Sequence, residues 1–556
     1  MEPGVTAEPA PAESSAPAPR KAPGVIKSSM IYSGLTLVSR FMGLARDLVI
    51  TARMGASLTA AADAYFTAQA FSNLFRRIFA EGAFAAAFVP SYSRKLAAEG
   101  DAPADKLATD ALATMAAATI VLTIVAQLAM PWIMLVYSPG YVSNPEKFRL
   151  AVVLTQITMP YLPCMVVASL LAGVLTARGR FIVYGLYPTI LNLVMLAAVW
   201  PQTDPVEAAY AASWATIVAG IGQAALCWWG AWKSGARVRL VVPRLNPEVK
   251  ALIKLTIPGA LASSAVQVNI FISTMLASQV SGMRVWMSVA DRFYQLPLSL
   301  VGTAIGVALL PRLSQAFGAG DEDDAQAAMD QALVFALALC LPAAAALMAM
   351  PVYLVDGLFT RGAFVHADAA ASGAILFQYG WGLPAFVLVK ILQPAFFARQ
   401  DTKTPMRFSL ISVAVNIGAG VALFYTVGFV GIAAATSIAT WITVAQMALT
   451  LRSRAAYHPS GRAWFKMARV AAASLGMGLA MFAASQFRPM LEAPLAGFSL
   501  GGLHAKEITV LLVCVAGALV YVALLFAFGG LTPAELKAAL RRRGGGPAPA
   551  EGPVTD

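Results

Sequence analysis

The sequence predicts an all-α integral membrane protein with about fourteen transmembrane helices, and three observations support this fold class. Hydrophobic residues make up 59% of the 556 residues and charged residues only 12%, with a mean hydropathy of +0.70. A soluble domain contains about 25% charged residues. Apolar runs long enough to cross a bilayer, which needs about 20 residues, recur along the chain. Finally, the basic residues concentrate in connections on one side of the predicted membrane.

The predicted elements follow one another with short connections. Residues 1–24 are rich in Ala, Pro, Ser and Glu and predict a disordered tail without a cleaved signal peptide. Several of the helices that follow are longer than a bilayer crossing requires, which indicates tilt, kinks or extension beyond the bilayer. Residues 531–556 predict a cytoplasmic C-terminal tail. The predicted helices span residues 28–53, 61–95, 107–137, 149–176, 181–201, 207–233, 248–280, 284–316, 325–355, 368–398, 405–426, 429–451, 463–487 and 505–529.

The distribution of basic residues predicts the orientation of these helices. With both termini in the cytoplasm, 27 of the 40 Lys and Arg residues fall in cytoplasmic tails and connections, seven outside and six within helices. This bias is the positive-inside signature of a multi-pass membrane protein and supports an even number of spans. The seven outside residues are Arg53, Lys147, Arg149, Arg284, Arg361, Arg488 and Lys506.

A weak internal repeat, in which the matching residues lie 221 positions apart, predicts two lobes. Pro90 and Ser93 correspond to Pro311 and Ser314, and a second set of matches continues the same register farther along the chain. Because six helices separate the copies, both copies have the same orientation, as in the parallel repeats of several transporters. We expect an N-lobe at 25–235, a C-lobe at 236–455 and an added pair of helices at 456–530. The second set pairs Leu162, Pro163, Leu171 and Arg178 with Leu383, Pro384, Leu392 and Arg399.

Eight charged residues in the first two helices are the best functional clue. A charge at the centre of a membrane helix costs about 2.5–3.5 kcal/mol on insertion scales, so charges that remain there predict a polar cavity. Their net charge of +2 suits an anionic ligand. Alternatively, the charges pair with each other and only orient helices. The eight are Arg40, Arg46, Asp47, Arg53, Asp63, Arg76, Arg77 and Glu81.

The first helix carries a charged face. Arg40, Gly43 and Asp47 have the spacing i, i+3, i+7 and share that face, with Arg46 on its flank. We expect Arg40 and Arg46 to face the cavity and Arg53 to lie at the outer interface.

The second helix places two adjacent arginines about 100° apart. Arg77 and Glu81 have the spacing i, i+4 and are expected to pair, which leaves Arg76 freer to face the cavity. A guanidinium suits a phosphate ligand because its planar fork donates two parallel hydrogen bonds and stays charged. The C-lobe repeats the charged theme sparingly, with Asp291 and Arg292 in the eighth helix and Lys390 in the tenth.

Other candidate sites are weaker. The four cysteines and three histidines have no spacing typical of disulfides or a metal site, so no metal or cofactor is expected. The acidic run 321–324 is interpreted as a solvated helix start. Asn269 and Asn416 could coordinate a cation, although hydrogen bonding between helices is the better interpretation.

Several motifs resemble those of the MurJ/MviN lipid II flippases. The segment 39–47 (SRFMGLARD) is similar to the family's first-helix signature, and 73–90 (NLFRRIFAEGAFAAAFVP) to its most distinctive block. Ala290-Asp291-Arg292 and the segment 390–405 also match. The resemblance extends from about Ser33 to the fourteenth helix.

This resemblance implies a fold of the multidrug/oligosaccharidyl-lipid/polysaccharide exporter superfamily. It implies transport of the undecaprenyl-diphosphate-linked peptidoglycan precursor, lipid II, to the periplasmic leaflet. Arg40, Arg46 and Arg292 would contact the diphosphate, Asp63 and Arg76 would be further cavity residues, and the last two helices would hold the lipid tail. Gln295 stands where many relatives are expected to have a glutamate, so a gating salt bridge there is in doubt.

The predicted mechanism is alternating access without covalent chemistry, so the protein is expected to be a transporter and not an enzyme. The membrane potential or a co-transported monovalent cation would drive it. The expected partners are lipid II, membrane lipids and other proteins of cell wall synthesis, with no nucleic acid. Alternatives are an exporter of another polyprenyl-diphosphate-linked glycan, a drug/cation antiporter of the same superfamily, or a membrane enzyme acting on polyprenyl phosphates.

Overall fold

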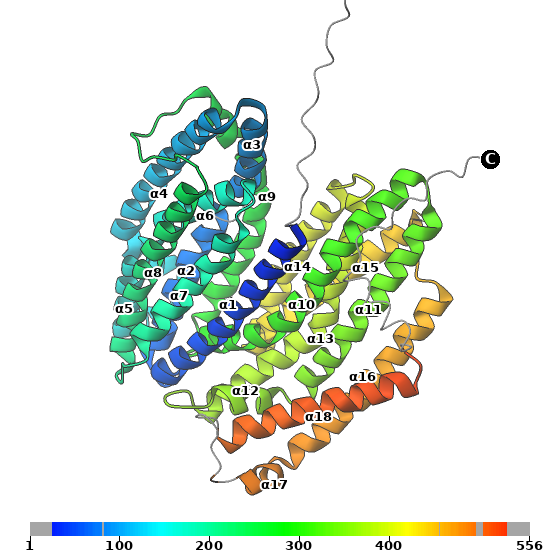
Figure 1. Cartoon of the computed structure of the whole chain (residues 1–556). Helices are drawn as coiled ribbons and strands as arrows, with labels where there is room; N and C mark the ends of the chain where they lie inside the picture. Colours follow the sequence, from blue (N-terminus) through cyan, green and yellow to red (C-terminus); the bar gives the residue numbers. More distant parts are fainter. Residues whose placement is uncertain (1–24, 80–82, 455, 496, 498–503, 531–556) are drawn as a thin grey trace, which may run out of the picture.

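The computed structural model describes residues 25–79, 83–454, 456–495, 497 and 504–530, and its regular elements are α-helices and short 3-10 helices. The predicted tails 1–24 and 531–556 lie outside this described part. Two helical bundles stand side by side, approach each other near α12 and diverge toward α3 (Figure 1). The prediction of an all-α membrane protein is therefore confirmed.

The first bundle contains the helices of the predicted N-lobe. Helix α1 packs against α7 and α8, and α2 packs against α5. The elements are α1 (Val25–Met54), α2 (Ala60–Phe79), α3 (Ala83–Glu99), α4 (Asp101–Tyr137), η1 (Pro139–Tyr141), α5 (Pro145–Thr158), α6 (Tyr161–Ala177), α7 (Phe181–Val199) and α8 (Pro205–Lys233).

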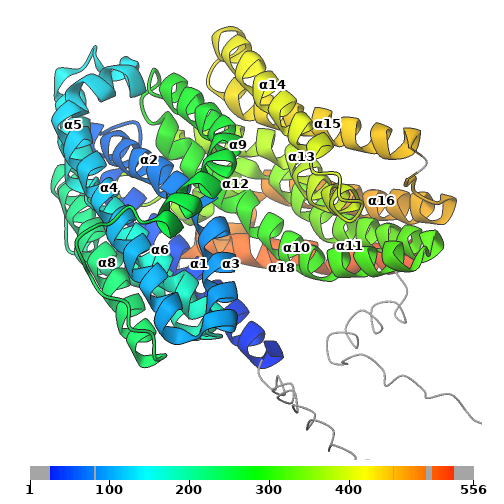
Figure 2. The same ribbon diagram turned by 90° about the horizontal axis from the view of Figure 1, so that it is seen from above.

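The second bundle continues from an intermediate helix, α9, which contacts α3 and α4 of the first bundle as well as α14. The predicted lobe boundary at 235/236 stays a prediction. Helices α16 and α18 cover the flank of the second bundle, where they pack on α11 and α12 (Figures 1 and 2). The elements are α9 (Pro247–Ala277), α10 (Met283–Ala319), α11 (Glu322–Ala349), α12 (Pro351–Phe359), α13 (His366–Phe397), α14 (Lys403–Val427), α15 (Val430–Ser453), α16 (Gly461–Gln486), α17 (Arg488–Glu492), η2 (Ala493–Leu495) and α18 (Ala505–Ala527).

Each predicted helix has a counterpart in the structure, and two of them are divided. The fourth forms α5 and α6, and the ninth forms α11 and the start of α12. The second corresponds to α2 and α3, between which residues 80–82 lie outside the described part. Prolines explain both breaks, because Pro160 and Pro351 lack the N–H that would continue the helix ladder. Ten segments of the described part are long and apolar enough to cross a membrane.

The helix boundaries confirm the parallel repeat. The register that pairs residue 90 with residue 311 also pairs Asp101 with Glu322, where α4 and α11 begin. It likewise pairs Pro145 with His366, where α5 and α13 begin. The offset inferred from a few Pro and Arg matches therefore relates whole elements of the two bundles. Two positions that this register pairs are called repeat mates below.

Candidate functional site

A cavity of about 740 Å³ lies between the two bundles. Most of its lining side chains come from α1, α2, α9 and α10, and the rest mainly from α6, α7 and α8. The polar residues of these four helices that line the cavity face a polar space and not the lipid.

The repeat places equivalent positions of both bundles in the cavity wall. Arg46 and Gln267 are repeat mates, as are Leu74 and Gln295, and all four line the cavity. The same faces therefore point inward in each copy, but the side chains differ in charge. The two bundles thus contribute equivalent backbone positions to the cavity wall, but side chains of different charge.

Cationic side chains dominate the cavity wall. Six arginines and a single carboxylate line it among the described residues. Arginines from both bundles take part, so a ligand in the cavity could be held by both at once. They are Arg40, Arg46, Arg76 and Arg77 from the first bundle, Arg284 and Arg292 from the second, and the carboxylate is Asp291.

Asp47 holds two of these arginines together. Arg46 donates to one Asp47 oxygen through Nε at 2.9 Å and Nη2 at 2.7 Å, and Arg292 forms an ion pair with the other. Arg46 and Asp47 are both buried, whereas the Arg292 side chain is 38% exposed. Since Arg292 belongs to α10, this triad connects the two bundles across the cavity.

Asn192 is a site residue that the sequence analysis missed. Its side-chain oxygen accepts from Arg46 at 3.1 Å, and its amide nitrogen donates to the Ser39 carbonyl at 2.9 Å. The amide thus fixes the Arg46 guanidinium against α7. A buried amide within the apolar run 181–201 was an available signal, because polar groups inside membrane helices need partners.

The other predicted arginines also reach the cavity. Arg40 donates to the Ser299 hydroxyl at 2.6 Å and so makes a second link between α1 and α10. Arg76 donates to the Asn73 side chain at 3.0 Å within α2, and Arg77 lines the cavity with a largely exposed side chain. Glu81, the predicted partner of Arg77, lies outside the described residues.

Several predicted residues are absent from the cavity lining. Asp63 is buried elsewhere, Lys390 is an exposed residue of α13, and Asn416 lies in α14 with its amide 3.3 Å from the Thr436 hydroxyl. Arg53 donates to the Trp200 carbonyl at 2.7 Å, which ties the end of α1 to the end of α7.

Asp63 belongs to a network that joins the bundles at one end of the cavity, which we call the closed end. Its carboxylate pairs with Lys147 of α5 and accepts from the backbone N–H of Gly282 at 2.8 Å. Lys147 also donates to the Ser281 hydroxyl at 3.4 Å. Because residues 281 and 282 precede α10, these contacts cross from the first bundle to the second.

The repeat mate of Lys147 completes the closed end. This residue, Asp368, accepts from the Ser57 backbone N–H at 3.1 Å and from the Ser57 hydroxyl at 2.5 Å. It also accepts from the Trp286 indole at 2.9 Å. The first turn of α5 thus reaches the second bundle and the first turn of α13 reaches the first.

Arg284 also lies at this end, although the charge distribution predicts it among the residues outside the membrane. It is buried in the first turn of α10 and donates to the carbonyls of Thr274 at 2.8 Å and Tyr137 at 3.1 Å. Its guanidinium lies 5.1 Å from the centre of the Tyr141 ring, which Lys147 approaches from 4.5 Å. Arg284 is the repeat mate of Asp63 and carries the opposite charge.

Three amide oxygens near the second-bundle wall have no hydrogen-bond partner within the described part of the chain. They belong to Gln267, Asn269 and Asn416. Gln267 and Asn269 line the cavity, whereas Asn416 contacts the cavity-lining Thr436.

The described residues contain no group of three or more His, Cys, Asp or Glu side chains that could hold a metal ion. The acidic run begins α11, where the Asp321 side chain accepts from the Asp324 N–H at 2.9 Å. This contact confirms the predicted helix start.

Comparison with known proteins identifies the family. The family model described as "Lipid II flippase MurJ" matches residues 50–493. A probable lipid II flippase MurJ of Rhizobium tropici is 36% identical over 95% of this chain and 98% of its own length. A second from Rhizobium meliloti is 35% identical over 93% and 96%.

Solved structures show the same fold. An inward closed conformation of lipid II flippase MurJ covers 90% of this chain and 98% of its own, with a TM-score of 0.73 and 23% identity. An inward-facing multidrug resistance transporter of the MATE family covers 77% of this chain and 98% of its own, with a TM-score of 0.59 and 14% identity. The family model and the sequence identities together show that this chain belongs to the lipid II flippase MurJ family.

Proposed function

We propose that the protein moves lipid II from the cytoplasmic to the periplasmic leaflet of a bacterial cytoplasmic membrane. Family membership supports lipid II as the substrate. The observation that supports binding of its diphosphate is that arginines from both bundles line one cavity. The diphosphate of lipid II offers several anionic oxygens, which guanidinium groups bind through charge-assisted hydrogen bonds. The cavity needs no reacting group for this task, because flipping breaks no covalent bond.

Four of the six cavity arginines have a role in this proposal. Arg40, Arg46 and Arg292 hold the diphosphate, and Arg76 lies close enough in the cavity wall to contact the headgroup. Asp47 keeps Arg46 and Arg292 together until the ligand arrives. A bound diphosphate with two negative charges then takes over part of the role of Asp47, because it also reduces the repulsion between Arg46 and Arg292.

Alternating access follows from the closed end. The contacts of Asp63 and Asp368 hold the bundles together at one end while the cavity lies between them. Separation of these contacts would expose the headgroup on the other side of the membrane. Asp63 therefore acts in gating and not by touching the diphosphate.

The proposed orientation places the closed end at the periplasmic face. Its connections contain Lys147, Arg361 and few other basic residues, whereas most basic residues fall at the opposite end. Both termini are then cytoplasmic. Helices α16 and α18, which flank the second bundle, would hold the polyprenyl tail, and other proteins of cell wall synthesis would act at the same membrane.

The driving force is the membrane potential or a monovalent cation. Moving one charge through 100 mV corresponds to about 2.3 kcal/mol. The unpartnered amide oxygens of Gln267, Asn269 and Asn416 support the cation alternative, because amide carbonyls are hard oxygen donors.

The rival functions fit the cavity less well. A drug/cation antiporter shares the fold, but six arginines repel organic cations. An enzyme acting on polyprenyl phosphates would need a metal-binding acidic pair, whereas the described cavity wall holds only Asp291. An exporter of another polyprenyl-diphosphate-linked glycan would use the same anion chemistry.

A leaflet-specific assay of lipid II in cells tests the proposal. Depletion of the protein should accumulate the precursor on the cytoplasmic side without changing its chemical structure. Arg40→Ala/Arg46→Ala should do the same while remaining inserted in the membrane. Arg53→Ala is the matched control, because Arg53 lies on the same helix but donates to the Trp200 carbonyl and does not line the cavity. Normal translocation by the stably inserted double variant would refute the proposal.

A further inference from the structure

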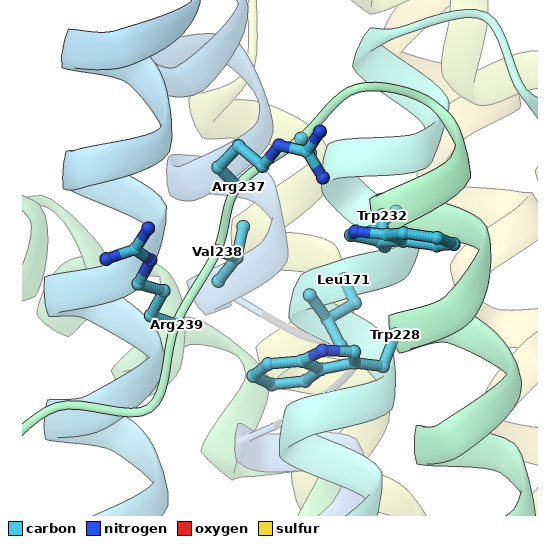
Figure 3. Close-up of a pocket in the computed structure, with 8 residues that line it drawn as sticks. Leu171, Trp228, Trp232, Arg237, Val238 and Arg239 are labelled. Carbon is cyan, nitrogen blue, oxygen red and sulfur yellow. The ribbon is translucent and has the colours of Figure 1, made fainter.

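A second pocket lies apart from the central cavity, at the end of the first bundle opposite the closed end. Its volume is about 320 Å³, and it is bounded by α6, the last turns of α8 and the strip 236–239 that follows α8 (Figure 3). Helix α8 is one of the apolar segments long enough to cross the membrane. The pocket therefore lies at the end of a helix that is long enough to span the membrane, where such a helix would reach the lipid headgroups.

Two arginines flank this pocket because the strip 236–239 is held in an extended form. The backbone N–H of Arg237 donates to Asp105 at 2.7 Å, and that of Arg239 donates to Thr109 at 3.2 Å, both on α4. Ala236 and Val238 consequently face the protein and are at most 9% exposed. The side chains of Arg237 and Arg239 are exposed and both line the pocket. In Figure 3 the Arg237 guanidinium reaches toward Trp232, and Arg239 lies on the other side of the strip.

The opposite wall is aromatic. Trp228 forms the base of the pocket and Trp232, which is 58% exposed, stands at its edge (Figure 3). The Arg237 guanidinium lies 6.0 Å from the Trp232 ring centre. No carboxylate pairs with Arg237 or Arg239 among the residues that the structure describes. Two cations that lack carboxylate partners thus stand above an apolar floor.

We infer that this pocket binds the headgroup of an anionic glycerophospholipid. The arginines would bind its phosphate, while the tryptophans and Leu171 would contact its glycerol backbone and the start of one acyl chain. Tryptophan is enriched at the membrane interface, and basic clusters next to spanning helices attract anionic lipids. In the proposed orientation the lipid belongs to the cytoplasmic leaflet. The inference does not depend on which substrate the central cavity transports.

Native mass spectrometry of the purified full-length protein tests this site. The protein in detergent is mixed with phosphatidylglycerol or with phosphatidylcholine, and the lipids that stay bound are counted. The wild-type chain should retain one phosphatidylglycerol that Arg237→Gln/Arg239→Gln binds about 30-fold more weakly, because each basic side chain near an anionic surface contributes a factor of about five. Arg244→Gln is the matched control, since Arg244 is exposed in the same connection but does not line the pocket.

Three outcomes would overturn the inference. In the first, the double variant retains as much phosphatidylglycerol as the wild-type chain. In the second, the wild-type chain retains as much phosphatidylcholine as phosphatidylglycerol. In the third, glycerol 1-phosphate displaces the bound lipid when both are present at the same concentration. The last would assign the site to a soluble phosphate. If the glutamine variant melts early, Arg237→Lys/Arg239→Lys replaces it and should still prefer phosphatidylglycerol, and loss of that preference would also contradict the site.

Discussion

Asp47 illustrates how one buried carboxylate can organise the cations of a transport cavity. Each of its oxygens serves a different arginine, one on its own helix and one on the other bundle. Two guanidinium groups held this close would repel each other strongly in a medium of low dielectric constant. The carboxylate makes their proximity tolerable, and it leaves the triad with a net positive charge for an anionic ligand.

Replacement of this carboxylate should therefore be costly. Asp47→Asn leaves Arg46 and Arg292 without their shared counter-charge, and breaking a buried pair costs about 3–5 kcal/mol. We expect a lower melting temperature in detergent and reduced lipid II translocation. Asp47→Glu, which keeps the charge, is the control and should melt closer to the wild-type chain. An unchanged melting temperature for Asp47→Asn would show that the triad does not stabilise the fold.

At the scale of elements, the closed end depends on contacts between helix starts and connections. The first turn of α5 supplies Lys147, the first turn of α13 supplies Asp368, and both reach the connection before a helix of the other bundle. These polar contacts involve few residues. They can therefore separate as a unit when the bundles move.

Loss of the Asp63 carboxylate should open this end. Asp63→Asn removes the charge that pairs with Lys147 and accepts from the Gly282 N–H of the second bundle, so a cysteine placed in the cavity as Ser288→Cys should react faster with a membrane-impermeant thiol reagent from the periplasmic side. The parent chain, which keeps its four native cysteines, gives the background. Equal labelling rates with and without Asp63→Asn would argue against a gating role.

Replacement of a glycine by alanine tests the same end, because the added methyl group would overlap its neighbours. The backbone N–H of Gly140 donates to the Ser278 hydroxyl at 3.1 Å, and a Cβ on Gly140 would overlap the Ser278 backbone carbonyl. Gly140→Ala should thus push η1 away from the end of α9 and increase labelling at Ser288→Cys. Gly418→Ala is the control, because nothing lies within 4 Å of the Cβ that it adds. A Gly140→Ala chain that labels like the Gly418→Ala chain would contradict this packing.

At the scale of the whole molecule, α9 contacts α3 and α4 of the first bundle, and further links between the bundles lie at the closed end and along α1 and α10. The two bundles can then move as bodies, with the cavity exposed at one face or the other. Transport in this arrangement requires that the closed end separate in every cycle.

A reversible link across the closed end should therefore stop transport. The connections meet there, since a Cβ on Gly282 would lie 3.0 Å from the Cα of Ser57. Ser57→Cys/Ser281→Cys, joined by a short cleavable thiol cross-linker, should lose lipid II translocation and regain it after reduction. Each single variant treated with the same reagent should stay active. Full activity of the linked chain would mean that this end does not open.

Sequence alone predicted the cavity better than the closed end. Arg46 and Arg76 were identifiable because a charge in an apolar helix is costly unless it faces a polar space. The partner of Asp63, in contrast, lies far along the chain in Lys147, and no local spacing indicates that contact. Arg284 was assigned to a connection because it stands at a helix end, where sequence does not distinguish a solvent-facing charge from a buried one.

The closed end also records how the two halves diverged. Asp63 and Arg284 occupy equivalent positions with opposite charges, and so do Lys147 and Asp368. The ion pair of Asp63 with Lys147 lies within the first bundle, whereas Asp368 accepts from Ser57 of the first bundle and Trp286 of the second. Equivalent positions of the two halves therefore make different contacts. A substitution at one of them removes an interaction that its repeat mate does not duplicate.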